Sequence, residues 1–394
     1  MSASDLVVGV VGAGAMGSGI AHVAAAAGHR VVLGDERPES VAQARAAIAK
    51  SVARDVEKGR LDQAAANALL GRISDAGHLA EGYAAFSLCG VVIEAVVEDL
   101  AVKRTLFARL EQVVASDAIL ATNTSSLSVA AIAGGCARPE RVVGIHFFNP
   151  APLMPLVEIV PSIMTSDDVA GAAASLVDGW KKTTVMASDT PGFIVNRIAR
   201  PFYSESLRQL EEGIADHATI DWAMREIGGF RMGPFELMDL IGNDVNFAVT
   251  ASVYDAFFFD PRYRPALTQK RLVDAGLFGR KAGRGYYDYR DGAARPEPTR
   301  DVVVGTAIVD RTLAMLVNSA VDAVFLRVAS ARDVETAMQK GVNYPKGLLA
   351  WGDEIGAPEI LRRLTVLQAE YGEERYRASP LLRRTVASGG LLLA

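Results

Sequence analysis

The stretch "LVVGVVGAGAMGSGIAHVAAAAGHRVVLGD", residues 6–35, decides the fold of the first half of this 394-residue chain. A β-branched run leads into Gly12, Gly14 and Gly17, which have G-x-G-x-x-G spacing, and small residues at helical spacing follow. In such a strand–turn–helix unit the first glycine permits the tight turn, the second lets a pyrophosphate approach, and the third lets helix and strand pack closely. Free N–H groups at the helix N-terminus then favour phosphates. The pattern predicts a dinucleotide-binding unit.

An aspartate closes the next predicted strand, at the distance from the glycines that a ribose-binding carboxylate requires. Asp35 accepts hydrogen bonds from a ribose and repels the 2′-phosphate of NADP, so we expect NAD(H); Arg37, two residues later, leaves NADP open. FAD uses the same turn, and a structural turn with a surface aspartate is the alternative without function. The expected cofactor contacts in this region are Gly12, Ala13, Gly14, Ala15, Met16, Gly17 and Asp35.

The composition excludes several classes of protein. Half of the residues are hydrophobic, 22% are charged, and the net charge is −5 without a long basic cluster, so nucleic acid is not an expected partner. The only two cysteines, Cys89 and Cys136, provide neither a disulfide framework nor a zinc pattern, and no metal is expected. The N-terminus lacks the features of a signal peptide, and no long apolar stretch free of glycine and charge predicts a membrane span. We expect a cytoplasmic protein.

The chain changes character near Asp189. Strand-like and helix-like segments alternate before it, which predicts a mostly parallel, doubly wound α/β sheet of the Rossmann type. Helical patterns dominate after it, and a segment rich in Gly, Pro and charge, 279–301, reads as a linker. The predicted domains are an NAD-binding domain at 1–188, a helical substrate and dimerisation domain at 189–294, and a second, degenerate helical repeat at 295–394.

The second helical block resembles the first. Shifting Arg197–Gly242 by 114 residues lays it over Arg311–Gly356 without a gap, and eight of 46 positions are identical. Two unrelated helical segments of similar composition are the alternative. The copy has Asp310 where the first block has Asn196, and it lacks a nucleotide-binding unit of its own. We therefore expect no second active site, and the copy stands in for part of a partner's helical domain or pads a dimer interface.

Polar residues follow the later strands, where open α/β sheets bind their ligands. "VVIEAVVEDLAVKRTLF" carries Glu94, Glu98 and Lys103, and "NTSSLS" begins at Asn123 directly after a strand. The structural alternatives are a solvated charge for Lys103 and a helix cap for "NTSSLS".

One histidine and one glutamate interrupt the apolar stretch "GIHFFNPAPLMPLVEIV", residues 144–160. His146 and Glu158 lie in two predicted buried strands, where a polar group is costly without a partner. A carboxylate on the neighbouring strand fixes the imidazole tautomer and raises its basicity, which suits proton abstraction from an alcohol during hydride transfer. The alternative is a buried hydrogen-bonded pair without a catalytic role.

Taken together and in order, six motifs resemble the L-3-hydroxyacyl-CoA dehydrogenase family over about residues 5–290. They are "GAGAMGSGIAHVAAAAGHRVVLGD", "VVIEAVVEDLAVKRTLF", "NTSSLSV", "GIHFFNPAPLMPLVEIV", "DTPGFIVNRI" and "MGPFELMDLIG". The duplicated helical block is similar to bacterial members with two such domains, including enzymes of phenylacetate and butyrate-type pathways.

The resemblance implies a role for each matching residue. His146 is the expected general base, Glu158 its orienting carboxylate, and Ser125 the residue that hydrogen-bonds the reacting hydroxyl. Asn196 is the expected substrate contact that completes the site. Further expected cofactor contacts are Glu98, Lys103, Ser125, Asn149 and Lys281, and the expected coenzyme A contacts are Ser51 and Lys58.

The implied activity is the NAD-dependent, reversible oxidation of an L-3-hydroxyacyl-CoA to the 3-ketoacyl-CoA by a homodimer that associates through its helical domains. Short aliphatic and dicarboxylic acyl groups, such as 3-hydroxyadipyl, both remain open, within fatty acid metabolism and β-oxidation or phenylacetate degradation. The alternatives are a hydroxyacid or sugar-acid dehydrogenase on the same fold and a non-catalytic structural homologue. A fused dehydrogenase–hydratase is excluded because the chain has no second catalytic module of sufficient length.

Overall fold

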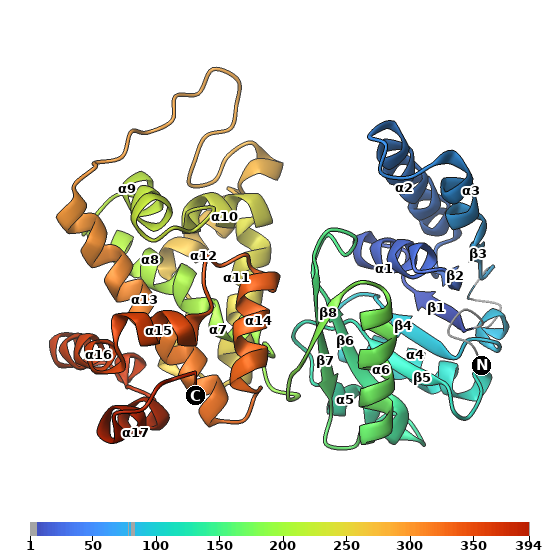
Figure 1. Cartoon of the computed structure of the whole chain (residues 1–394). Coiled ribbons are helices and arrows are strands. Elements are labelled where there is room, and N and C mark those ends of the chain that lie inside the picture. Colours follow the sequence, from blue (N-terminus) through green and yellow to red (C-terminus); the bar gives the residue numbers. More distant parts are fainter. Residues whose placement is uncertain (1–5, 78, 80–82, 394) are drawn as a thin grey trace. The chain divides into compact units, whose positions relative to one another are not determined.

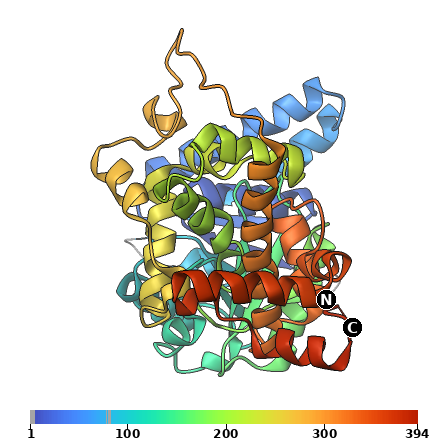
Figure 2. The ribbon, with the colours of Figure 1, turned by 90° about the vertical axis from the view of Figure 1, so that its left-hand side faces the viewer.

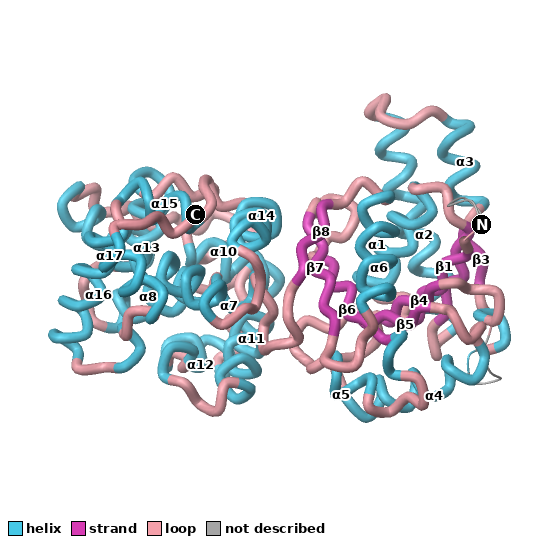
Figure 3. Tube along the Cα trace, turned by 60° about the horizontal axis from the view of Figure 1, so that its bottom comes forward, coloured by secondary structure: helices cyan, strands magenta, loops and turns pink. Residues whose placement is uncertain are grey.

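The computed structural model describes residues 6–77, 79 and 83–393. The chain divides into two compact units, Met1–Thr190 and Pro191–Ala394. Strands, magenta in Figure 3, fill the first unit, and the second is built from helices. The predicted division of the helical half at residue 295 stays a prediction, because the described residues on both sides of it belong to one compact unit.

An eight-stranded sheet in the order β3-β2-β1-β4-β5-β6-β7-β8 forms the first unit (Figure 1). β7 pairs with β6 in antiparallel fashion and with β8 in parallel fashion, and the other neighbours are parallel. The expected mostly parallel Rossmann-type sheet is confirmed. Its strands are β1 (Val7–Val11), β2 (Arg30–Gly34), β3 (Ile73–Asp75), β4 (Val91–Glu94), β5 (Ile119–Thr122), β6 (Val142–Phe147), β7 (Leu156–Pro161) and β8 (Thr183–Met186).

Helices cover this sheet because its strands are apolar on both faces. Val8, Val10, Leu33, Ile93 and Ile145 are all fully buried. The helices are α1 (Ala15–Ala26), α2 (Pro38–Glu57), α3 (Gln63–Gly71), α4 (Leu100–Val113), α5 (Val129–Ala133) and α6 (Asp167–Gly179), with short 3₁₀ turns η3 (Ala84–Phe86) and η4 (Pro139–Arg141).

The described regular elements of the second unit are all helices or helical turns, and two isolated β-bridges join Arg284 to Gly279 and to Asp288. Its elements are α7 (Val195–Ile198), α8 (Arg200–Glu211), α9 (His217–Trp222), the π-helical turn η5 (Ala223–Ile227), α10 (Pro234–Ile241), α11 (Asn243–Ala256), η6 (Pro261–Tyr263), α12 (Leu267–Asp274), η7 (Arg280–Ala282), α13 (Val302–Phe325), α14 (Ala331–Gly341), α15 (Leu348–Ile355), α16 (Ala357–Tyr371), η8 (Glu374–Tyr376) and α17 (Pro380–Ser388). The connector between η7 and α13 loops away from the helices (Figures 1 and 2).

Helix α13 is the central element of this unit and packs against α8, α15, α16 and α17. Among the described helices it alone is long and apolar enough to cross a membrane by length and composition. Its most apolar window is 61% buried inside the structure, as the core helix of a globular unit would be.

The structure reproduces the sequence repeat in detail. The 114-residue shift lays α10 on α15 from end to end, and it brings the starts of α11 and α16 together. Asp221 accepts hydrogen bonds from the first N–H groups of α10, and Glu335, the residue that the same shift assigns, does so for α15. Asp239 and Asp353, a second matched pair, each bind two consecutive backbone N–H groups. The two helical blocks are therefore copies of one design.

Ion pairs cross between the two copies. Arg262 on η6 reaches Asp322 on α13 at 2.9 Å, and Arg375 on η8 reaches Glu205 on α8 at 3.3 Å. Arg208 on α8 pairs with Glu373 at 3.0 Å, and η6 packs against η8. Each copy thus supplies arginines to carboxylates of the other.

Candidate active site

His146 and Glu158 face each other across the antiparallel pair β6 and β7. The register places them directly opposite, so their side chains lie on the same face of the sheet. The imidazole Nδ1 lies 2.6 Å from the Glu158 Oε2, with Glu158 fully buried and His146 5% exposed. Because a carboxylate only accepts, Nδ1 carries the hydrogen and Nε2 of the neutral ring carries the lone pair.

A turn held by one carboxylate carries Ser125. Glu98 Oε1 accepts hydrogen bonds from the Thr124 hydroxyl at 2.6 Å and from the N–H groups of Ser125 and Ser126 at 3.0 and 3.2 Å. Burial opposes ionisation, yet Lys103 and the donors of this turn hold the pKa of Glu98 below its ordinary value. The turn follows β5, and Asn123 at its start accepts a hydrogen bond from the N–H of Phe147 at 2.8 Å. Ser125 is thus fixed at the carboxyl end of the strand beside β6.

Lys103 lies beneath this turn rather than at the surface. Its side chain is 1% exposed, and its Nζ lies 2.5 Å from Glu94 and 3.2 Å from Glu98. Glu94 is fully buried and also accepts a hydrogen bond from the Thr122 hydroxyl at 2.7 Å. The structure therefore shows Lys103 as the cation that joins two carboxylates, and its contact with the cofactor stays a prediction.

The glycine turn has the geometry that its sequence predicts. Gly12 has φ of +102°, and a side chain at Gly17 would collide with the carbonyl oxygen of Gly12 at 1.7 Å. A side chain at Gly14 would meet no described atom within 4 Å, which leaves the space through which a pyrophosphate approaches. Gly14 precedes α1 without a side-chain cap, so the N–H groups that follow are available to phosphates. Asp35 accepts the N–H of Ala13 at 2.8 Å, which ties the turn to the end of β2.

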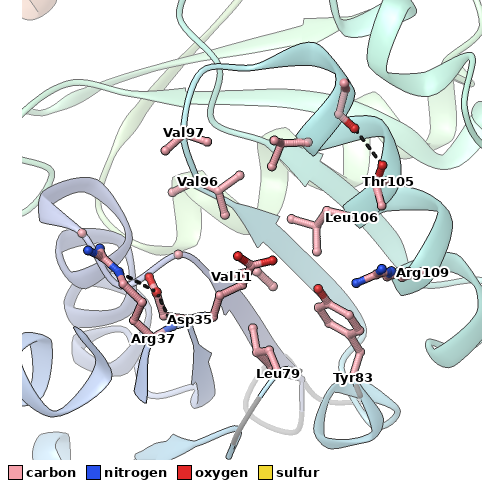
Figure 4. A pocket seen from close by; sticks show the side chains of 16 residues that line it. Val11, Asp35, Arg37, Leu79, Tyr83, Val96, Val97, Thr105, Leu106 and Arg109 are labelled. Carbon is pink, nitrogen blue, oxygen red and sulfur yellow. Dashed lines mark hydrogen bonds and ion pairs between the residues drawn. The ribbon is translucent and has the colours of Figure 1, made fainter. Parts of the chain in front are cut away.

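A cavity of about 650 Å³ opens beside this turn. Figure 4 shows Asp35 and Arg37 at one side of it and Tyr83, Leu106 and Arg109 at the other. Its size and mixed polar and apolar lining suit the adenosine half of a dinucleotide. Tyr83 and Arg109 lie outside the sequence motifs, because they come from the segment before β4 and from the second half of α4, whereas Leu106 belongs to the motif that carries Lys103.

A second cavity, of about 790 Å³, lies in the same unit and is lined by both predicted coenzyme A contacts, Ser51 and Lys58. Helices α2 and α3 form a hairpin, and these two residues lie near the C-terminal end of α2. Arg54, Arg60 and Lys181 add positive charge to the lining, which suits a phosphorylated ligand. The other predicted residues lie elsewhere: Asn149 follows β6, Asn196 is half-buried in α7, and Lys281 pairs with Asp244 at 2.7 Å in the second unit.

Comparisons with known proteins agree with this arrangement. The NAD-binding domain of 3-hydroxyacyl-CoA dehydrogenases matches residues 7–190, and the C-terminal domain of the same enzymes matches twice, at 192–289 and 308–392. The second of these two matches confirms the duplication.

Several relatives cover most of the chain. The 3-hydroxyadipyl-CoA dehydrogenase of Escherichia coli K12 is 39% identical, over 96% of each chain. The 3-hydroxybutyryl-CoA dehydrogenase of Bradyrhizobium diazoefficiens is 42% identical over 74% of this chain and 98% of its own. A crystal structure described as 3-hydroxybutyryl-CoA dehydrogenase from Escherichia coli K12 superposes with a TM-score of 0.90, at 38% identity, over 98% of this chain and 99% of the other. The chain therefore belongs to the 3-hydroxyacyl-CoA dehydrogenase family and is an NAD-dependent oxidoreductase that oxidises the hydroxyl-bearing carbon of a 3-hydroxyacyl-CoA.

Proposed function

We propose that His146 is the general base of this oxidation and that Glu158 orients it. The 2.6 Å bond between buried, facing residues carries the proposal, because it sets the tautomer in which Nε2 accepts a proton. The 3-hydroxyl proton moves to Nε2 as the hydride leaves C3, and Glu158 stabilises the imidazolium that forms. NAD⁺, when bound, accepts that hydride. The reverse reaction uses the same groups, with the imidazolium as the acid.

Two residues orient the substrate in this proposal. Ser125 donates or accepts a hydrogen bond at the reacting oxygen. The hydrogen bond from the Ser125 N–H to the Glu98 carboxylate fixes the turn and supports this role. Asn196 contacts the substrate. The turn residues from Gly12 to Gly17, together with Asp35, bind the cofactor, and Glu98, Lys103, Asn149 and Lys281 support its binding. Ser51 and Lys58 bind coenzyme A, as their shared cavity with further basic residues suggests.

The second helical copy acts as an internal partner rather than as an active site. It has Asp310 where the first copy has Asn196, and the arginines of each copy pair with carboxylates of the other. Truncation after about residue 295 would remove one partner from each of these pairs. We expect the truncated chain to aggregate or to associate with itself, as sedimentation would show. A truncated chain with unchanged oligomeric state and activity would contradict the supporting role.

We further propose that the protein is a cytoplasmic homodimer that associates through its helical unit. Large apolar side chains exposed on that unit support a contact surface, among them Phe258 and Phe259 at 91% and 61% exposure. Cys89 and Cys136 are free thiols, which suits a reducing compartment. Analytical ultracentrifugation of the wild type and a Phe258→Ser, Phe259→Ser variant tests the association, which the variant should weaken.

The His146→Gln variant tests the chemistry. We expect it to lose turnover by roughly 10²- to 10⁴-fold while NADH binding persists, because only proton transfer is removed. Turnover within a few-fold of the wild type would contradict the assignment of the base. A panel of 3-hydroxyacyl and 3-ketoacyl thioesters, assayed with NAD(H) and NADP(H), establishes the cofactor preference.

A further inference from the structure

The segment 122–128 contains five hydroxyl groups, and only that of Ser125 makes no hydrogen bond with the residues that the structure describes. Each of the other four donates to a carboxylate: Thr122 to Glu94 at 2.7 Å, Thr124 and Ser126 to Glu98 at 2.6 and 2.9 Å, and Ser128 to Asp189 at 2.8 Å. The segment therefore uses its other hydroxyls to hold itself in place and leaves the Ser125 hydroxyl available to a ligand.

Asp189 holds the far end of this segment. It opens the sequence motif "DTPGFIVNRI", follows β8 and lies 61 residues after Ser128. Its Oδ1 accepts a hydrogen bond from the N–H of Val129 at 2.9 Å, and its Oδ2 accepts one from the N–H of Ala130 at 2.7 Å as well as that of the Ser128 hydroxyl. Helix α5 has five residues, too few to fix its position through internal hydrogen bonds. The carboxylate of Asp189 therefore anchors the start of α5.

Between the two carboxylates the backbone has little freedom. Five of the six N–H groups of 125–130 bind a side chain: Glu98 accepts two, the Thr124 hydroxyl oxygen accepts a third at 2.9 Å, and Asp189 accepts two more. Breaking such a bond leaves a backbone group unsatisfied, which is costly away from water. A displacement at Asp189 is therefore transmitted along the segment to Ser125.

Helix α5 lies on the face of the sheet that carries His146. Gly144 and His146 are two residues apart on β6, so their side-chain positions point to the same face. A side chain at Gly144 would lie 3.0 Å from that of Val129, the first residue of α5. The helix thus packs directly on the strand of His146, and the place of its start sets where the serine turn lies relative to that histidine.

We propose that Asp189 is a positioning residue for the oxidation, which keeps Ser125 in place relative to His146 by anchoring α5. The inference rests on the proposed function, because it takes Ser125 as the residue that hydrogen-bonds the reacting oxygen. Asp189 itself exchanges no proton or hydride and acts through the backbone of the segment that it holds.

The position of Asp189 requires a carboxylate rather than an amide. Two backbone N–H groups and one hydroxyl converge on its two oxygens, and both oxygens act as acceptors. An asparagine would turn an NH₂ group, which only donates, toward one of the two N–H donors. Asp189→Asn therefore keeps the size of the side chain and breaks the anchor.

A double-mutant cycle between Asp189→Asn and Ser125→Ala tests the inference, with the single-turnover rate of NADH formation at saturating NAD⁺ as the measurement. Ser125→Ala should lower this rate by roughly 100-fold, as loss of one donor at a reacting oxygen does. Asp189→Asn should lower it by roughly 10- to 100-fold, because a displacement of about 1 Å has an effect of that order. In the Ser125→Ala background the same change should lower it by less than about threefold, because the hydroxyl that it would misplace is gone.

Glu111→Gln is the matched control. Glu111 on α4 also accepts hydrogen bonds from two consecutive backbone N–H groups, those of Ala137 and Arg138 at 2.7 and 2.9 Å, but these lie beyond the C-terminal end of α5. This variant should be less stable to denaturant than the wild type and should change the single-turnover rate by less than about threefold.

The outcomes separate the two proposals. Equal losses from Asp189→Asn with and without the Ser125 hydroxyl overturn the inference, because they indicate a structural role, and so does a folded Asp189→Asn protein with the wild-type rate. If Asp189→Asn does not fold, Ser128→Ala, which removes one of the three hydrogen bonds to Asp189, takes its place in the cycle under the same criterion. The proposed role of Ser125 fails instead if Ser125→Ala alone retains the wild-type rate, and the inference then fails with it.

Discussion

The Glu158→Gln variant isolates the contribution of the carboxylate to the proposed base. The amide has the same shape, so the backbone register between β6 and β7 should persist, while the negative charge beside Nδ1 is lost. A hydrogen bond to a charged group contributes about 1.5–3 kcal/mol. Glu158 is fully buried, and solvent does not screen its interaction with the imidazolium that forms during the reaction. With about 1.4 kcal/mol for each factor of ten, kcat should fall by roughly 10- to 150-fold.

Stopped-flow absorbance of NADH formation measures the chemical step directly, and fluorescence titration measures NADH binding, which should not change. The matched control is His29→Gln. His29 is also a buried histidine, with Nδ1 3.2 Å from the carbonyl oxygen of Leu6, but it directly precedes β2, at the amino end of a strand, whereas His146 lies near the carboxyl end of the parallel strand β6. The His29→Gln protein should be less stable than the wild type and should keep the wild-type kcat.

The reasoning would be refuted by a folded Glu158→Gln protein whose single-turnover rate stays within twofold of the wild type. It would be equally wrong if His29→Gln lost as much of the rate, since burial of any histidine would then explain the effect.

Three further results follow from the structure. Asp35→Ser should raise the ratio of kcat/KM for NADP⁺ to kcat/KM for NAD⁺ by at least roughly tenfold, because about 1.4 kcal/mol of repulsion between the carboxylate and the 2′-phosphate is removed. An unchanged ratio would show that Asp35 does not face the ribose. Ser51→Ala and Lys58→Met should raise KM for the acyl-CoA several-fold at nearly constant kcat, and steady-state kinetics with a free 3-hydroxy acid as the control substrate should show no such rise. Burial raises the pKa of Asp221 to about 7, so the folded chain holds its proton longer than the unfolded one. The free energy of unfolding should therefore fall as the pH rises from about 4 to about 7, by at most about 1.4 kcal/mol for each pH unit. Denaturant titrations should show a smaller fall over this range in Asp221→Asn. The same slope in both proteins would contradict the raised pKa.

Local rules in the sequence predict the nucleotide-binding unit well. Gly12 and Gly17 have positions that only glycine fills, so the turn can be read from the chain alone. The buried strands around His146 and Glu158 are also predictable, because a polar group in an apolar run requires a partner. Their direct opposition is not, since the register depends on pairing across the whole ladder.

Other features depend on contacts between distant segments, which the sequence does not show. Lys103 in the first turn of a helix has the pattern of a solvated residue, and only the fold places Glu94 beneath it. Tyr83 and Arg109 belong to no motif, and they line the same cavity because η3, which follows Tyr83, packs against α4.

The ion pairs that cross between the helical copies have a consequence for dilute protein. Two separate chains that met through such pairs would dissociate as their concentration fell. Within one chain the connector between η7 and α13 keeps the copies together, so the second copy is always present at a high effective concentration. The helical unit should therefore hold its fold at nanomolar protein, where a partner supplied by another chain would already be lost.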